Sequence, residues 1–216
     1  MKKLDDIILK NITHQGGSNF EKEQSTLFIS VLNNIKEPLP TMIELGSNDS
    51  YYSILFNKFF DPIPTINVCV EISNNLINLG KSNVERNSCT NFKFKHARVG
   101  RINTKYFEGV LRDHPNLIGD VADNTITIQS ILQEFNIEKL SLIHMDIQGS
   151  EISVLEEIRD NKIPIEYFFI STHPTQAEIP THDPCIKILN EIGVEYIYNN
   201  PRGGGYGDGL IIGRKI

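Results

Sequence analysis

Short runs of apolar residues alternate along the chain with longer stretches in which apolar residues recur every three or four positions. The runs are typical of buried strands, and the spaced stretches are typical of amphipathic helices. The predicted strands lie at 41–45, 66–71, 92–97, 140–145, 165–171, 194–198 and 208–214. The predicted helices lie at about 20–37, 50–60, 74–85, 128–135, 152–158 and 185–192.

The order of these elements indicates an α/β fold. Strands that alternate with helices form a mostly parallel sheet with helices on both faces. The last two strands flank a Gly-rich loop at 203–207, which predicts an antiparallel hairpin. A long irregular stretch at 99–122 is typical of a functional or a mobile segment. Because no repeat or linker divides the chain, we expect one domain over 1–216, with a helical or lid segment at 1–40 and a core at 41–216.

Charge and cysteine content narrow the class of protein. The net charge is -6 and no block of basic residues occurs, which disfavours binding to nucleic acid or to an anionic membrane. No segment approaches the roughly 20 apolar residues that span a bilayer, and the first residues do not read as a signal peptide. Cys69, Cys89 and Cys185 are widely spaced, which predicts free thiols and a cytoplasmic protein.

The turn after the first predicted strand is the first candidate for a binding site. Open α/β sheets bind ligands beyond the carboxyl ends of their strands. Gly46 lets the backbone turn and approach a ligand closely. Glu71 ends the next strand, where a carboxylate can accept both hydroxyls of a ribose. The pattern also occurs at an ordinary strand–turn–helix corner.

Two classes of cofactor use this layout. A dinucleotide site needs the glycines of G-x-G-x-x-G to admit a pyrophosphate, and here Gly46 stands alone. Glu44 and Asp49 would also repel a pyrophosphate. S-adenosylmethionine carries no phosphate, and its sulfonium and ammonium groups are cations. The acidic turn therefore favours S-adenosylmethionine.

Three stretches of the chain are similar to one known family. They are Met42-Ile43-Glu44-Leu45-Gly46-Ser47-Asn48, then Val70-Glu71-Ile72, and then 125–132 with Asp146-Ile147-Gln148-Gly149-Ser150-Glu151 and Val154-Leu155. Over about residues 40–172 the chain resembles the FkbM family of S-adenosylmethionine-dependent O-methyltransferases. The resemblance implies a Rossmann-like class I methyltransferase fold with a seven-stranded, mostly parallel sheet. It also implies methyl transfer to a hydroxyl, often of a sugar or natural product.

The chain departs from the family pattern at several positions. Ser50 stands in place of a glycine, His144 in place of a lysine and Gln148 in place of a glutamate, and Gln129-Ser130 replaces an Asp pair. These changes leave the cofactor prediction intact and the substrate-side chemistry open. The favoured acceptor is a sugar hydroxyl, free or in a glycan. The alternatives are a Rossmann-type oxidoreductase or epimerase and a cofactor-binding module without catalysis.

Most residues expected at the cofactor belong to these motifs. Ala97 and Arg98 are added because the resemblance implies a base pocket after the third strand, and Gln15 and Gly17 because their segment is polar and flexible. They are Gln15, Gly17, Glu44, Gly46, Ser47, Asn48, Ser53, Glu71, Ile72, Ala97, Arg98, Asp146 and Gln148. Arg98 would bind the adenine or serve as a surface charge. The segment at 15–20 would form a lid or a helix-capping loop.

Methyl transfer to an alcohol requires an in-line hydroxyl and removal of its proton. Asp146 and His173 follow neighbouring strands, so we expect both over one cleft, either as the base or as its partner. The alternatives are a helix cap for Asp146 and a loop histidine for His173. The expected substrate contacts are His144, His182, Asp183 and Tyr206, with an N-cap as the alternative for Asp183 and a hairpin turn for Tyr206. Because Asp146 is the only hard oxygen ligand expected at these strand ends, we predict catalysis without a metal.

Overall fold

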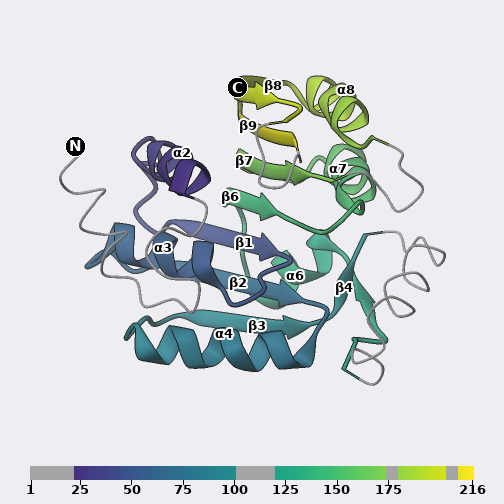
Figure 1. Cartoon of the computed structure of the whole chain (residues 1–216). Helices are drawn as coiled ribbons and strands as arrows, with labels where there is room; N and C mark the ends of the chain where they lie inside the picture. The colour runs from purple at the N-terminus through teal and green to yellow at the C-terminus, as the bar shows by residue number, and fades with distance from the viewer. Residues whose placement is uncertain (1–21, 101–119, 174–179, 203–208) are drawn as a thin grey trace.

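A seven-stranded sheet forms the centre of the protein (Figure 1). The computed structural model describes residues 22–100, 120–173, 180–202 and 209–216. The sheet has the order β3-β2-β1-β6-β7-β9-β8. Its strands are β1 (Thr41–Leu45), β2 (Ile66–Glu71), β3 (Phe92–His96), β6 (Leu140–Met145), β7 (Ile165–Thr172), β8 (Val194–Asn200) and β9 (Gly209–Lys215). β9 runs antiparallel to β7 and to β8, whereas the other neighbours are parallel, which confirms the predicted sheet.

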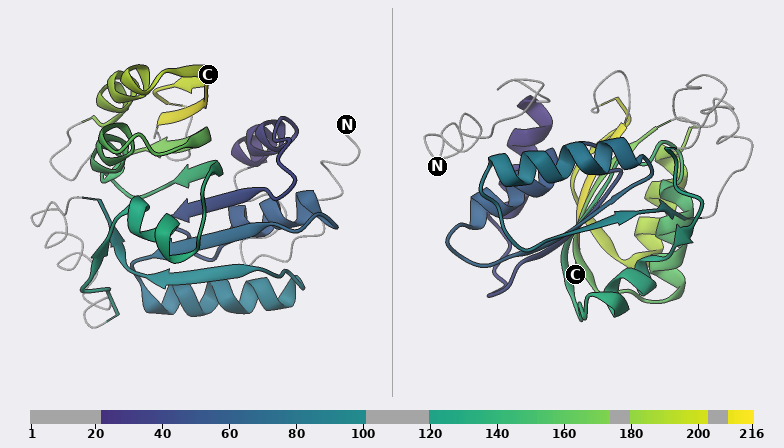
Figure 2. Two further views of the ribbon diagram at one scale, coloured as in Figure 1. Left: turned by 180° about the vertical axis from the view of Figure 1, so that it is seen from behind. Right: turned by 90° about the horizontal axis from the view of Figure 1, so that it is seen from below.

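Helices cover both faces of this sheet (Figure 2). One face carries α2 (Lys22–Leu32), α3 (Tyr51–Phe60) and α4 (Asn74–Arg86), and the other carries α6 (Ile128–Glu134), α7 (Glu151–Asp160) and α8 (His182–Ile192). Each layer has its own cluster of buried apolar side chains. A strand buried on both faces needs apolar residues without alternation, which is why the central strands read as short apolar runs.

The order of the strands reverses between β1 and β6, and we call the region beyond the carboxyl ends of these two strands the crevice. From β1 the chain proceeds to β2 and β3 on one side, and it then returns to β6 on the other side of β1. Such a reversal of strand order opens a space beyond the carboxyl ends of the two strands. The turn that contains Gly46 and the loop that begins at Asp146 both lie there, joined by a hydrogen bond of 3.0 Å from Asp146 N to Leu45 O.

Two local features differ from the prediction. α2 ends at Leu32 and not near residue 37, because the side chains of Asn33 and Asn34 donate to helix carbonyls four positions earlier, at 2.9 and 2.8 Å. Asparagine commonly competes in this way with continued helix. A short parallel pair, β4 (Arg98–Val99) and β5 (Thr125–Ile126), was not predicted. Most of the predicted irregular stretch at 99–122 lies outside the described residues.

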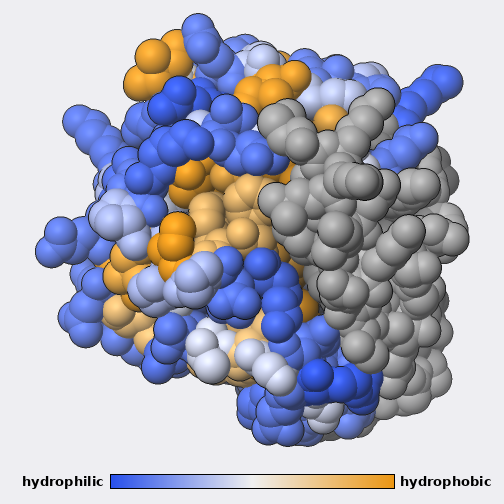
Figure 3. Space-filling view, turned by 90° about the vertical axis from the view of Figure 1, so that its left-hand side faces the viewer, coloured by the Kyte–Doolittle hydropathy of each residue, from blue (hydrophilic) through white to orange (hydrophobic). Residues whose placement is uncertain are grey.

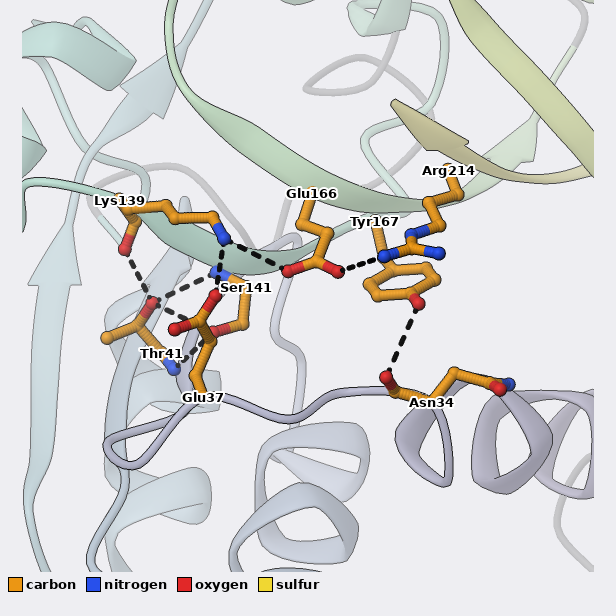
Figure 4. A network of polar contacts seen from close by, with 8 residues as sticks. All are labelled: Asn34, Glu37, Thr41, Lys139, Ser141, Glu166, Tyr167 and Arg214. Carbon is orange, nitrogen blue, oxygen red and sulfur yellow. Dashed lines mark hydrogen bonds and ion pairs between the residues drawn. The ribbon is translucent and has the colours of Figure 1, made fainter. Parts of the chain in front are cut away.

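Polar side chains join the opposite edge of the sheet, where the parallel strands begin (Figure 4). Glu166 accepts hydrogen bonds from Lys139 Nζ at 3.2 Å and from Arg214 Nη2 at 3.1 Å. Tyr167 Oη donates to Asn34 O at 3.5 Å, which ties β7 to the residues after α2. Several of these side chains are exposed, so each pair adds little stability. Their role is to fix the scaffold at the edge away from the crevice.

The surface at this edge includes an apolar hollow. Figure 3 shows hydrophobic residues gathered in it, with hydrophilic residues above and below. Leu39 and Ile63, which precede β1 and β2, are 45% and 48% exposed. Within the described part of the chain, no helix combines the length and apolar character that crossing a membrane requires.

Candidate active site

The backbone of the turn after β1 lies very close to the backbone of the loop after β6. Gly46 has a φ of +72°, and its N–H donates to Val70 O at 2.9 Å. Asn48 and Ser50 also have positive φ, at 46° and 66°. A Cβ added to Gly46 would lie 1.9 Å from the carbonyl oxygen of Asp146. Only glycine therefore allows this turn to pack directly on the loop after β6.

The Glu71 carboxylate holds this turn in place. Its Oε2 accepts from Asn48 N at 2.9 Å, and its Oε1 accepts from the N–H groups of Ile72 and Ser73 at 2.8 and 3.0 Å. Burial raises the pKa of Glu71, and the negative charge of Asp146 raises it further. A carboxylate offers about four acceptor sites, so Glu71 can accept another hydrogen bond beside the three it receives. Two mutually repelling carboxylates at one crevice favour a cationic ligand.

Glu44 lies beneath α3. Its side chain is 2% exposed, and its Oε2 accepts from Ser53 N at 3.0 Å. Burial raises the pKa of Glu44 to about 8, so the carboxyl is mostly neutral at pH 7. Ser53 is fully buried and accepts a hydrogen bond from Cys69 Sγ at 3.3 Å. The acidity of the crevice therefore comes from Glu71 and Asp146 rather than from Glu44.

The structure brings Asp146 and His173 together, as the sequence predicted. His173 Nε2 lies 3.3 Å from Asp146 Oδ1, and the imidazole is almost fully buried. Gln148 Nε2 donates to the same Oδ1 at 3.1 Å, so Gln148 also belongs to this group. His173 follows β7 and Asp146 follows β6, which are adjacent parallel strands. Their side chains therefore meet at the carboxyl edge of the sheet.

Glu151 is a member of this group to which the sequence assigned no role. It is fully buried at the start of α7, and its Oε1 lies 3.3 Å from Nδ1 of His173. It also accepts backbone hydrogen bonds from Ile147 N at 3.3 Å and Gly149 N at 2.8 Å. An acidic residue in the first turn of a helix is a sequence signal for such backbone contacts. Its contact with His173 depends on the fold.

The predicted adenine side lies at the ends of β2 and β3. Ala97 N donates to Glu71 O at 3.1 Å, and Arg98 N donates to Asn124 O at 2.9 Å. Ile72 O accepts from Ala122 N at 2.8 Å. These contacts dock the segment before α6 against the end of β2. Ile72, Ala97 and Arg98 are therefore brought beside Glu71.

His144 lies in an aromatic cluster on the face covered by α2 and α3. Its ring stacks on Tyr52 and Phe169, with centroids 4.4 and 5.4 Å apart. The side chain is 2% exposed, and among the described residues neither ring nitrogen has a hydrogen-bond partner. Burial lowers the pKa of His144 to about 3. The structure thus surrounds this predicted substrate residue with core side chains.

His182 and Asp183 lie at the start of α8. Nδ1 of His182 is 2.8 Å from Thr172 Oγ1, and Nε2 is 2.8 Å from Asn199 Oδ1. Protein groups therefore satisfy both nitrogens. Asp183 is exposed in the first turn of the helix. The alternative that Asp183 is the N-cap is wrong, because the helix begins at His182 and Thr181 is the N-cap.

Three of the predicted site residues, Gln15, Gly17 and Tyr206, lie outside the described residues. Within the described ranges, no three His, Cys, Asp or Glu side chains are grouped so that they could hold a metal ion. Cys69, Cys89 and Cys185 are free thiols, as predicted.

Comparisons with known proteins give one family match and several similar folds. The model of the Methyltransferase FkbM domain matches residues 15–196. Solved structures similar to the chain include a SAM-dependent methyltransferase from Aquifex aeolicus, with 12% identity, a TM-score of 0.54, and 100% of this chain and 96% of that chain covered. An O-methyltransferase from Bacillus cereus in complex with SAH has 12% identity and a TM-score of 0.54, with 99% and 88% covered.

An rRNA methylase from Streptococcus thermophilus is also similar, with 6% identity, a TM-score of 0.54, and 88% of this chain and 95% of that chain covered. No curated protein sequence matches the chain. At these identities the structural likeness shows the fold alone, and it confirms the predicted Rossmann-like methyltransferase fold. One fold serves many acceptors, so the acceptor must be argued from the site.

Proposed function

Because the chain belongs to the FkbM family of methyltransferases, we propose that it transfers the methyl group of S-adenosylmethionine to a hydroxyl group of a sugar, free or in a glycan. The observation that carries this proposal is the group of Asp146, His173 and Glu151 at the crevice between β1 and β6, beside Glu71. S-adenosylmethionine supplies a methyl electrophile on a cationic sulfur. The chain supplies a binding turn and groups that can take a proton.

The residues at the crevice fit this cofactor. The turn of Gly46, Ser47 and Asn48 packs on the loop that begins at Asp146, because Gly46 lacks a Cβ, and this holds its backbone at the carboxyl end of β1 beside Glu71. Glu71 can accept a ribose hydroxyl. The carboxylates of Glu71 and Asp146 favour cations, whereas they would repel a pyrophosphate. We assign the adenine side to Ile72, Ala97 and Arg98, and we assign Gln148, which donates to Asp146, to the cofactor site as well.

The acid–base group supports a hydroxyl acceptor. An alcohol must lose its proton as it attacks, so its methylation benefits from a positioned base. His173 and Asp146 can hold that proton at the crevice. A sugar presents hydroxyl groups and carries no strong negative charge, which suits a chain of net charge -6. The similar rRNA methylase makes RNA the acceptor to be tested against sugars.

Incubation with methyl-labelled S-adenosylmethionine and a panel of sugars, glycans and RNA should give a labelled O-methyl sugar, measured by mass spectrometry. Replacing His173 by alanine or Asp146 by asparagine should reduce turnover by about a hundredfold, since a positioned base contributes about that much or more. Label that enters RNA alone would contradict the proposed acceptor. Full turnover in both variants would contradict the assigned base.

Replacing Glu71 by glutamine should weaken binding of S-adenosylhomocysteine by about tenfold or more in calorimetry, because a charged acceptor to ribose and its hold on the turn are both lost. Glu85→Gln removes an exposed carboxylate from α4 and should leave the affinity unchanged. Equal affinity in Glu71→Gln and the parent would exclude the ribose assignment. Binding of NAD instead would favour the oxidoreductase alternative.

A cytoplasmic location is part of the proposal. The chain has three cysteines, and all are free thiols. Cys69 and Cys185 are buried, so neither is placed to form a disulfide on the surface. Free thiols are typical of proteins in a reducing compartment.

A further inference from the structure

Glu151 has no separate role in the proposed reaction, although it makes several close contacts at the crevice. Both of its oxygens accept backbone N–H groups before α7, and Oε1 also faces Nδ1 of His173 at 3.3 Å. The side chain is completely shielded from solvent. A buried carboxylate is retained only where hydrogen bonds compensate its lost hydration. Nδ1 of His173 is placed to be a further donor of this kind.

The two carboxylates beside His173 differ in how strongly each attracts the proton of the ring. Asp146 is 35% exposed at its side chain and accepts a hydrogen bond from Gln148, so water and an amide already stabilise its charge. Glu151 has no access to water. Electrostatic attraction is stronger where solvent is excluded. In the neutral ring this difference favours the proton on Nδ1, toward Glu151, which leaves the lone pair on Nε2, toward the crevice.

The backbone of His173 is fixed as well. Thr181 Oγ1 donates to His173 O at 2.6 Å, which links the end of β7 to the residue before α8. The imidazole side chain is only 9% exposed. The ring is thus held by the hydrogen bond to its backbone carbonyl, by the contact of Nδ1 with Glu151 and by burial. Nε2 lies next to Asp146, which follows β6 at the carboxyl edge of the sheet.

We propose that Glu151 is a positioning residue that fixes the Nδ1–H form of His173 and thereby makes Nε2 the base for the acceptor hydroxyl; this rests on the proposed function. The acceptor oxygen forms its bond to the methyl carbon as the bond from methyl to sulfonium breaks. The hydroxyl proton passes to Nε2. The products are a methyl ether, a neutral thioether and an imidazolium, whose charge lies between Glu151 and Asp146.

Within the part of the chain that the structure describes, few other titratable groups lie near this ring. Asp146 lies at the end of β6 and Glu151 at the start of α7, and Glu71 interacts with Asp146 from the end of β2. From α8, the Cys185 thiol faces Glu151, and burial together with that carboxylate raises the pKa of the thiol. Cys185 therefore stays protonated at neutral pH. The charge that acts on Nδ1 comes from Glu151.

Long-range proton–nitrogen NMR spectra of the full chain with labelled histidine test the ring directly. The chain has six histidines, and His173→Ala identifies the signals of His173 by their loss. In the parent, the neutral ring should show the Nδ1–H pattern. In Glu151→Gln, this pattern should give way to a mixture with Nε2–H. Glu156→Gln removes the same charge from the same helix and should leave the pattern unchanged.

Kinetics give a second readout. Glu151→Gln should lower kcat by about tenfold, leave the KM for S-adenosylmethionine unchanged and move the acidic limb of the pH–rate profile to lower pH, because the imidazolium loses a stabilising charge. A purely structural role would not move that limb. An Nε2–H pattern in the parent would overturn the inference, also where Glu151→Gln does not fold. An Nδ1–H pattern without any methylated sugar would support the inference and contradict only the proposed function.

Discussion

Replacing Gly46 by alanine is expected to lower the free energy of unfolding by more than about 3 kcal/mol and to abolish measurable cofactor binding. The added Cβ would lie 1.9 Å from the carbonyl oxygen and 2.9 Å from the carbonyl carbon of Asp146. Both are backbone atoms at the end of β6, so no side-chain rotation relieves the collision. The positive φ of +72° adds about 1–2 kcal/mol of strain for any residue with a Cβ.

The expected loss has two parts that a control separates. Gly193 ends α8 with a φ of +85°, and nothing lies within 4 Å of a Cβ added there. Gly193→Ala should therefore show the strain of the left-handed conformation alone, about 1 kcal/mol. Urea denaturation of both variants and calorimetry with S-adenosylhomocysteine measure the difference. If Gly46→Ala costs no more than Gly193→Ala, then the two loops do not meet as closely as described.

The Gly46 contact illustrates how far sequence reasoning reaches. The bounds of β1, β2 and β6 match their predicted ranges, because a central strand needs an uninterrupted apolar run and turn residues end it. The positive φ of a glycine after a strand was also foreseeable. The contact of Gly46 with Asp146 was not, since it joins residues 100 positions apart through the order of the strands.

Side-chain surroundings were the least predictable feature of the site. Asp146 and His173 follow adjacent strands, so strand order alone brings them together. Glu151 belongs to a motif that the sequence displays, yet its burial and its contact with His173 follow from packing of α7 against β7. Glu44 and His144 belong to the same motifs, and both turned out to lie in the core. A motif identifies residues near a site without giving the direction of each side chain.

Glu44 and His144 form a buried pair with opposite responses to pH. They are register partners on β1 and β6, and each is 2% exposed. Burial lowers the pKa of His144 from 6.5 to about 3 and raises that of Glu44 from 4.5 to about 8. In both cases burial disfavours the charged form. The folded protein therefore holds both groups neutral over much of the range between these values.

The sign of each effect follows from linkage. Below pH 6.5 the unfolded chain protonates His144 while the folded chain does not until about pH 3, so His144 reduces stability as the pH falls. Above pH 4.5 the unfolded chain ionises Glu44 while the folded chain does not until about pH 8, so Glu44 reduces stability as the pH rises. Each contributes about 1.4 kcal/mol per pH unit. Between pH 4.5 and 6.5 the two slopes are opposite in sign and cancel, so the stability of the parent shows neither of them.

Single substitutions should reveal the two slopes. His144→Phe keeps an aromatic ring between Tyr52 and Phe169, and its stability relative to the parent should rise by about 3 kcal/mol from pH 7 to pH 4. Glu44→Gln keeps an acceptor for Ser53 N, and its relative stability should rise by about 3 kcal/mol from pH 4.5 to pH 7. Urea denaturation at matched pH measures both. Relative stabilities that do not change with pH would mean that His144 and Glu44 titrate in the folded protein as they do in the unfolded chain. The core beneath the crevice would then be accessible to water.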